Sequence, residues 1–75
     1  MNVIQKTFLN PDCSRKVEIF QRSDETFGFE EMRFRLEENA WFPVGKYSVA
    51  IIDSLENAIK EATERVEWLR INELR

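Results

Sequence analysis

The sequence predicts an α+β fold, in which an antiparallel three- to four-stranded meander is followed by one C-terminal helix packed on one face of the sheet. Segments of alternating or β-branched apolar residues, separated by polar turns, occupy residues 16–52. A run of apolar residues at helical spacing then covers residues 54–70. With 75 residues, the chain is expected to form a single domain spanning residues 1–75.

The composition argues against several classes of protein. Hydrophobic residues make up 43% of the chain and aromatic residues 12%, which is typical of a folded domain rather than a disordered one. No apolar run approaches the roughly 20 residues of a membrane span, and residues 1–13 lack the apolar stretch of a secretory signal. Cys13 is the single cysteine, whereas small exported domains usually carry disulfides. We therefore expect a cytoplasmic protein with no membrane contact.

The first two segments end at strong turn signals. Residues 1–12 form either a first strand or an arm that leaves the domain, and we favour the strand. They end at an Asn-Pro-Asp sequence, which favours a turn. In residues 16–22, Val17 and Ile19 alternate with polar residues, which predicts a half-buried strand. Residues 23–26 are polar and fit a hairpin loop.

In residues 27–36, the apolar side chains occupy odd-numbered positions in the first half and even-numbered positions in the second half. One extra residue at Glu30 and Glu31 would bring all of them to a single face, so we predict a β-bulge there. The alternative is a regular strand whose two halves are covered on opposite sides. The apolar residues are Phe27 and Phe29 before the change, and Met32, Phe34 and Leu36 after it.

A second hairpin is expected before the helix. Residues 40–44 predict a short strand, in which Pro43 indicates an edge, a bulge or a strand end. Gly45 and Lys46 are expected to turn the chain into a further strand over residues 47–52.

The helix is the clearest element of the sequence. Asp53 and Glu56 have the spacing of a capping box, which places the start of the helix at about Ser54. The residues expected to face the sheet are Leu55, Ala58, Ile59, Ala62, Val66 and Leu69.

No motif for catalysis is present. The chain has no histidine, and therefore lacks the commonest general base and metal ligand. The paired carboxylates at 30–31 and 37–38 are adjacent residues, which point to opposite faces of a strand and do not converge. We expect no enzymatic activity, no cofactor, no metal and no small-molecule ligand.

Nucleic-acid binding is the alternative function. A net charge of −3, from 11 basic and 14 acidic residues, argues against it, because phosphate contacts need basic surfaces. A basic stripe with one stacking ring could nevertheless lie on the open sheet face. Its residues would be Lys16, Phe20, Arg22, Arg33 and Arg35.

Protein–protein contact is favoured over nucleic-acid binding. Trp68 and Ile71 lie roughly opposite the core stripe of the helix and would form an apolar interface patch, with Trp41 as a second candidate. Alternatively, the tail folds back and buries Trp68 and Ile71 on their own domain, and at least one ring of the stretch 41–43 belongs to the core. We expect a small protein-interaction module that forms a homodimer or docks on a larger assembly.

Overall fold

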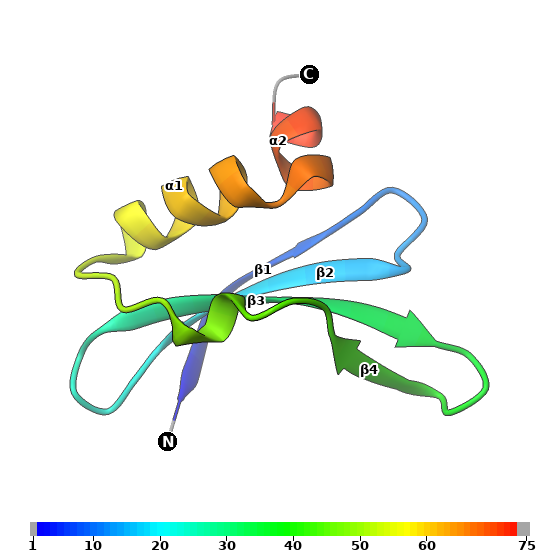
Figure 1. Ribbon diagram of the computed structural model, residues 1–75, viewed down its shortest axis with the longest axis horizontal. Coiled ribbons are helices and arrows are strands. Elements are labelled where there is room, and N and C mark those ends of the chain that lie inside the picture. The colour runs from blue at the N-terminus through cyan, green and yellow to red at the C-terminus, as the bar shows by residue number, and fades with distance from the viewer. Residues whose placement is uncertain (1, 74–75) are drawn as a thin grey trace.

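The computed structural model describes residues 2–73 and confirms the predicted fold class (Figure 1). A four-stranded antiparallel sheet with the order β1-β2-β3-β4 is followed by a helical segment that lies on one side of it. No helix among these residues is long and apolar enough to cross a lipid bilayer. The elements are β1 (Val3–Leu9), β2 (Arg15–Gln21), β3 (Phe27–Arg35), β4 (Ala40–Pro43), the 3-10 helix η1 (Tyr47–Val49), α1 (Leu55–Arg65) and α2 (Glu67–Glu73).

The predicted bulge at Glu30 and Glu31 is wrong. The pairing of β2 with β3 runs without a shift from Arg15 opposite Arg33 to Gln21 opposite Phe27. The irregularity lies in β1 instead, where the pairing with β2 shifts between Ile4 and Lys6.

The regular β3 strand is covered on opposite sides along its length, as in the alternative interpretation. Phe29 is fully buried in the core beneath the helices, whereas Phe34 contacts Trp41 on the other face, with ring centroids 5.3 Å apart. The parity change therefore reflects two apolar faces rather than an extra residue. Trp41 is half-buried in this second cluster and does not belong to the main core.

The expected strand over residues 47–52 is also wrong. The chain does not turn back after β4 but continues along the free half of β3. The N–H of Val44 donates to the Glu31 carbonyl at 2.8 Å, and Ile52 forms an isolated bridge with Phe27. Between these contacts the chain arches into η1, whose Tyr47 ring stacks on Phe29 at 5.3 Å. The packing of the Tyr47 ring against the core therefore favours η1 over the strand that the alternation of residues 47–52 predicts.

The helix is capped and ended differently from the prediction. Ser54, rather than Asp53, is the N-cap, and its hydroxyl accepts from the N–H of Asn57 at 3.1 Å. The single helix expected over residues 54–70 is broken at Val66, which is extended with φ −95° and ψ 106°. Because Val66 and Leu69 are both buried and Trp68 contacts the sheet, tertiary contacts outweigh the continuous helical pattern here.

The core lies between the helices and the two central strands (Figure 1). Ala58 and Ala62 are both fully buried, and their small side chains allow α1 to approach the sheet closely. Leu55 and Ile59 are only half-buried at the edge of this core, which is less than their helical spacing predicts. The buried core residues are Val17, Ile19, Phe29, Ile52, Ala58, Ala62, Val66 and Leu69.

Gly28 allows a ring to lie flat on the uncovered face of the sheet. Phe20 is opposite Gly28 and is only 5% exposed, although α1 and α2 lie on the other side of the sheet. A Cβ atom on Gly28 would lie 2.6 Å from Nη2 of Arg22 and 2.8 Å from Cζ of Phe20, so both side chains would have to shift. The Arg22 guanidinium covers the ring from above, 5.0 Å from its centroid.

Because the helix is broken at Val66, we expect α2 to depend on the packing of Leu69 in the core. Leu69 is 2% exposed, so Leu69→Ala is expected to lower the free energy of unfolding by about 2–5 kcal/mol in urea denaturation. Ile71 lies on the same short helix with 47% exposure, and Ile71→Ala should change stability by less than about 0.5 kcal/mol. Equal effects of the two substitutions would show that α2 is not packed as described.

Candidate functional site

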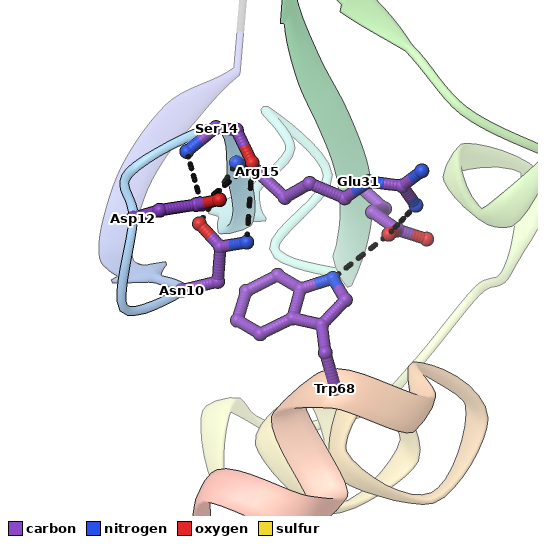
Figure 2. A network of polar contacts seen from close by, with 6 residues as sticks. All are labelled: Asn10, Asp12, Ser14, Arg15, Glu31 and Trp68. Carbon is purple, nitrogen blue, oxygen red and sulfur yellow. Dashed lines mark hydrogen bonds and ion pairs between the residues drawn. The ribbon is translucent and has the colours of Figure 1, made fainter.

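A buried carboxylate joins the sheet to α2. Glu31, in the middle of β3 on the helix side, is 5% exposed. Its Oε2 atom accepts a hydrogen bond from Nε1 of Trp68 at 2.8 Å and from the Arg15 guanidinium at 3.1 Å (Figure 2). We call these three residues the Glu31 clasp. A buried charge is tolerated only when it is paired and hydrogen-bonded, and the clasp meets both conditions.

The clasp explains the position of the predicted interface residues. The indole of Trp68 points down from α2 to the sheet and is half-buried against its own core, as the fold-back alternative predicts (Figure 2). Ile71 stays at the rim with 47% exposure. An interface through these residues stays a prediction, but the Trp68 N–H is already committed within its own chain.

A loop of short polar side chains positions Arg15. Oδ1 of Asn10 accepts from the Arg15 N–H at 3.0 Å, which ties the start of β2 to the end of β1 (Figure 2). Asp12 accepts from the Ser14 hydroxyl at 2.6 Å and from the Ser14 N–H at 3.0 Å. These two hydrogen bonds lower the pKa of Asp12 from its ordinary value of 3.8. Cys13, exposed and with φ 59°, lies at the turn of this loop.

An open groove of about 530 Å³ lies beside the clasp, between α2 and the sheet. Its lining includes Tyr47, Arg65 and Ile71 together with Glu31. Two basic and two acidic residues line the groove, so their charges cancel. They are Arg15, Arg65, Glu31 and Glu67. Within the described residues, no group of three or more His, Cys, Asp and Glu side chains is placed to hold a metal ion.

The structure divides the predicted basic stripe between two faces. Because paired residues share a face, Lys16 and Phe20 lie on the open side with Met32 and Gly28, whereas Arg33 lies on the helix side with Arg15. Arg35 shares the side of Arg33 because it is two residues further along β3. The predicted stripe therefore does not exist as one surface.

Cations on the open face are already engaged within the chain. Lys16 forms an ion pair with Glu18 at 3.1 Å and lies 4.6 Å from the centroid of the Trp41 ring. The Arg22 guanidinium holds the chain after β4 against the sheet. It donates to the carbonyl oxygens of Phe27, Ser48 and Ala50 at 3.0, 2.7 and 2.9 Å.

The outer edge of β1 is an accessible strand edge. β1 pairs only with β2, and no other strand among residues 2–73 covers its second side. Six of its seven residues are exposed, and Phe8 alone is half-buried. Three apolar residues are about half exposed, with values of 55% for Val3, 49% for Ile4 and 52% for Leu9. The parity pattern of the sequence did not single out this edge, because the segment lacks clear periodicity.

Glu31 was not predicted as a functional residue. Because Glu30 and Glu31 are adjacent and both charged, the sequence favoured a solvated bulge at this pair. Only the regular register of β3 places the Glu31 carboxylate under α2. The parity that Glu31 shares with Phe29 was the one signal in the sequence that could have identified it.

Comparisons of this chain with protein-family models, with curated proteins and with solved structures gave no match.

The clasp predicts a specific role for the Trp68 N–H. Trp68→Phe keeps an aromatic ring but removes the donor to Glu31, so it should cost about 1.5–3 kcal/mol of stability. Trp41→Phe is the matched control, because the Trp41 indole makes no hydrogen bond within residues 2–72. In a double-mutant cycle with Glu31→Gln, the effect of Trp68→Phe should shrink. Additive effects would show that the two residues are not coupled.

A second prediction concerns stability at low pH. Asp24 accepts from the Thr26 hydroxyl and N–H, which lowers its pKa as Ser14 lowers that of Asp12. Each carboxyl with a lowered pKa contributes stability that is present above 3.8 and is lost as the pH falls through its folded-state pKa. The melting temperature should therefore fall less steeply below pH 3.8 in Asp12→Asn/Asp24→Asn than in the wild type. Parallel curves would contradict the assignment.

Proposed function

We propose that this protein is a small cytoplasmic protein-interaction module with no catalysis of its own, and that it self-associates through the outer edge of β1. The single observation that supports this most is the exposed edge of β1, which combines free backbone groups with Val3, Ile4 and Leu9. The exposed thiol of Cys13 fits a reducing compartment, where a lone cysteine stays free.

Strand addition is the mode of contact that such an edge supports. A second strand would satisfy the outward N–H and C=O groups of β1, and would extend the sheet from four strands to eight in a symmetric pair. The other edge is less suited to this role. β4 is only four residues long and ends at Pro43, which has no N–H to donate.

Two features limit uncontrolled pairing at this edge. Lys6 is the only charged residue in β1, and the pairing irregularity between Ile4 and Lys6 distorts the strand. A symmetric pair centred on Lys6 would place two like charges opposite each other, which is unfavourable. Pairing centred on Thr7 instead places Lys6 opposite Phe8 of the second copy.

The expected association is weak. Burying part of the exposed surface of Val3, Ile4 and Leu9 in both copies would remove on the order of 250 Å² of apolar area, worth about 6 kcal/mol at ~25 cal/mol/Å². Association costs about 4–15 kcal/mol, so backbone hydrogen bonds must contribute the remainder. A module of this kind forms transient contacts rather than an obligate dimer.

The proposal predicts that a charge on β1 prevents self-association. Leu9→Lys places an ammonium group at the edge and should shift wild-type dimers to monomers in sedimentation experiments. Leu36→Lys is the matched control, because Leu36 is 80% exposed but lies outside β1, and it should leave the association unchanged.

Hydrogen exchange locates the contact independently of the substitutions. Raising the protein concentration should slow the exchange of β1 amides in the wild type but not in Leu9→Lys. A wild type that remains monomeric up to about 1 mM would contradict self-association. If β1 amides were then protected only by an added protein partner, docking on a larger assembly would replace self-association as the function.

A further inference from the structure

Three arginines and one exposed aromatic ring share the helix side of the sheet near the end of β3. Arg15 of β2 is directly opposite Arg33 of β3, and Phe42 of β4 is opposite Arg33 on its other side. Arg35 is two residues beyond Arg33 and therefore lies on the same face, with its guanidinium carbon 5.4 Å from the centroid of the Phe42 ring. We call these four residues the arginine patch.

The charges of the patch are incompletely balanced by the chain itself. Like charges placed directly opposite in a ladder destabilise a sheet, and Arg15 and Arg33 have this arrangement. Arg15 is paired with Glu31, but Arg33 has no carboxylate within ion-pair distance among the described residues. Arg35 pairs with Glu38, where both side chains are about 45% exposed, and such a surface pair contributes little stability. Arg33 therefore lacks a carboxylate partner among the described residues, and the exposed pair of Arg35 with Glu38 can open to bind an anion.

A shallow hollow of about 270 Å³ lies beside Arg33 and Arg35. Arg33, Arg35 and Phe42 line it, together with Pro43 and Val44. The Phe42 ring is 37% exposed, so part of it is open to a ligand. The hollow thus combines two cations, a π face and an apolar wall.

We infer that the arginine patch binds a nucleotide unit, with Arg33 and Arg35 on the phosphate and Phe42 stacked on the base. Guanidinium groups donate paired hydrogen bonds that match the geometry of phosphate oxygens. Stacking on an exposed ring is tolerant of base identity, so this site reads a nucleotide without strong sequence preference. The site lies away from the outer edge of β1, and the inference does not depend on self-association.

An acidic peptide is the competing ligand. Its carboxylates would also pair with Arg33 and Arg35, but they supply no planar ring for Phe42. Phe42 lies directly opposite Arg33, and the part of its ring that Arg35 leaves exposed therefore favours the nucleotide. The net charge of −3 opposes any polyanion at long range, so we expect weak binding that strengthens at low salt.

The test measures the binding of a fluorescein-labelled oligothymidylate by anisotropy across a range of salt concentrations. Arg33→Gln should weaken binding and reduce the slope of log affinity against log salt by about one phosphate contact. Phe42→Leu should weaken binding at least fivefold and leave that slope unchanged. Arg70→Gln removes an exposed arginine from α2, outside the patch, and should have neither effect. Circular dichroism of each variant verifies that the fold is retained.

Each outcome decides for or against the inference. Thymidine monophosphate that displaces the label at its own saturating concentration identifies a free nucleotide as the ligand, whereas displacement by the oligomer alone identifies a single strand. Polyglutamate that competes as well as unlabelled oligomer would overturn the inference in favour of an acidic peptide. Equal losses in Arg33→Gln and Arg70→Gln, or no binding of the wild type at low salt, would also overturn it.

The same measurements in Leu9→Lys separate this inference from the proposed self-association. Nucleotide binding should persist in that variant, because its substitution lies on β1.

Discussion

The regular pairing of β2 with β3 is the constraint on which the rest of the structure depends. Seven consecutive residue pairs join the two strands without a shift. Because neighbouring residues point to opposite sides, this register alone places Phe29 and Glu31 beneath the helices and Phe34 on the far face. A one-residue change would bring Glu30 under α2 and expose the core ring.

The register places Glu31 where it can bind α2. A carboxylate in a buried position requires donors, and the chain supplies them from the start of β2 and from α2. The Trp68 indole extends from α2 to the sheet, where it donates to Glu31. The backbone at Val66, between α1 and α2, is extended, which allows α2 to take the direction that this contact needs. The clasp thus links the direction of α2 to the middle of β3, through groups that are 37 residues apart.

The proposed contacts use different parts of the sheet. Self-association involves the outer edge of β1, whereas the arginine patch extends across β2, β3 and β4 on the helix side. In a pair related by a two-fold axis normal to the sheet, both patches would face the same side. A longer or repeated ligand could then contact both copies, which would raise its apparent affinity without new contacts at either site.

The sequence by itself determined the fold class and the strands predicted over residues 16–22 and 27–36, which the structure has at Arg15–Gln21 and Phe27–Arg35, because alternation and turn residues are local signals. It also determined that Ala58, Ala62, Val66 and Leu69 face inward, since helical spacing persists almost to the break. Only the tertiary structure decided which face each half of β3 uses. That choice depends on what covers the sheet, and a second apolar cluster at Phe34 and Trp41 produces the same pattern as a bulge.

The path of residues 44–52 and the break at Val66 were likewise decided by tertiary contacts. Tyr47 stacks on Phe29, and the chain around it forms η1 instead of the strand that the alternation of residues 47–52 predicts. The candidate sites depend on the same long-range geometry. Arg33 and Arg35 were recognised in the sequence, but Arg15 and Phe42 join them only through strand pairing, which no local pattern specifies.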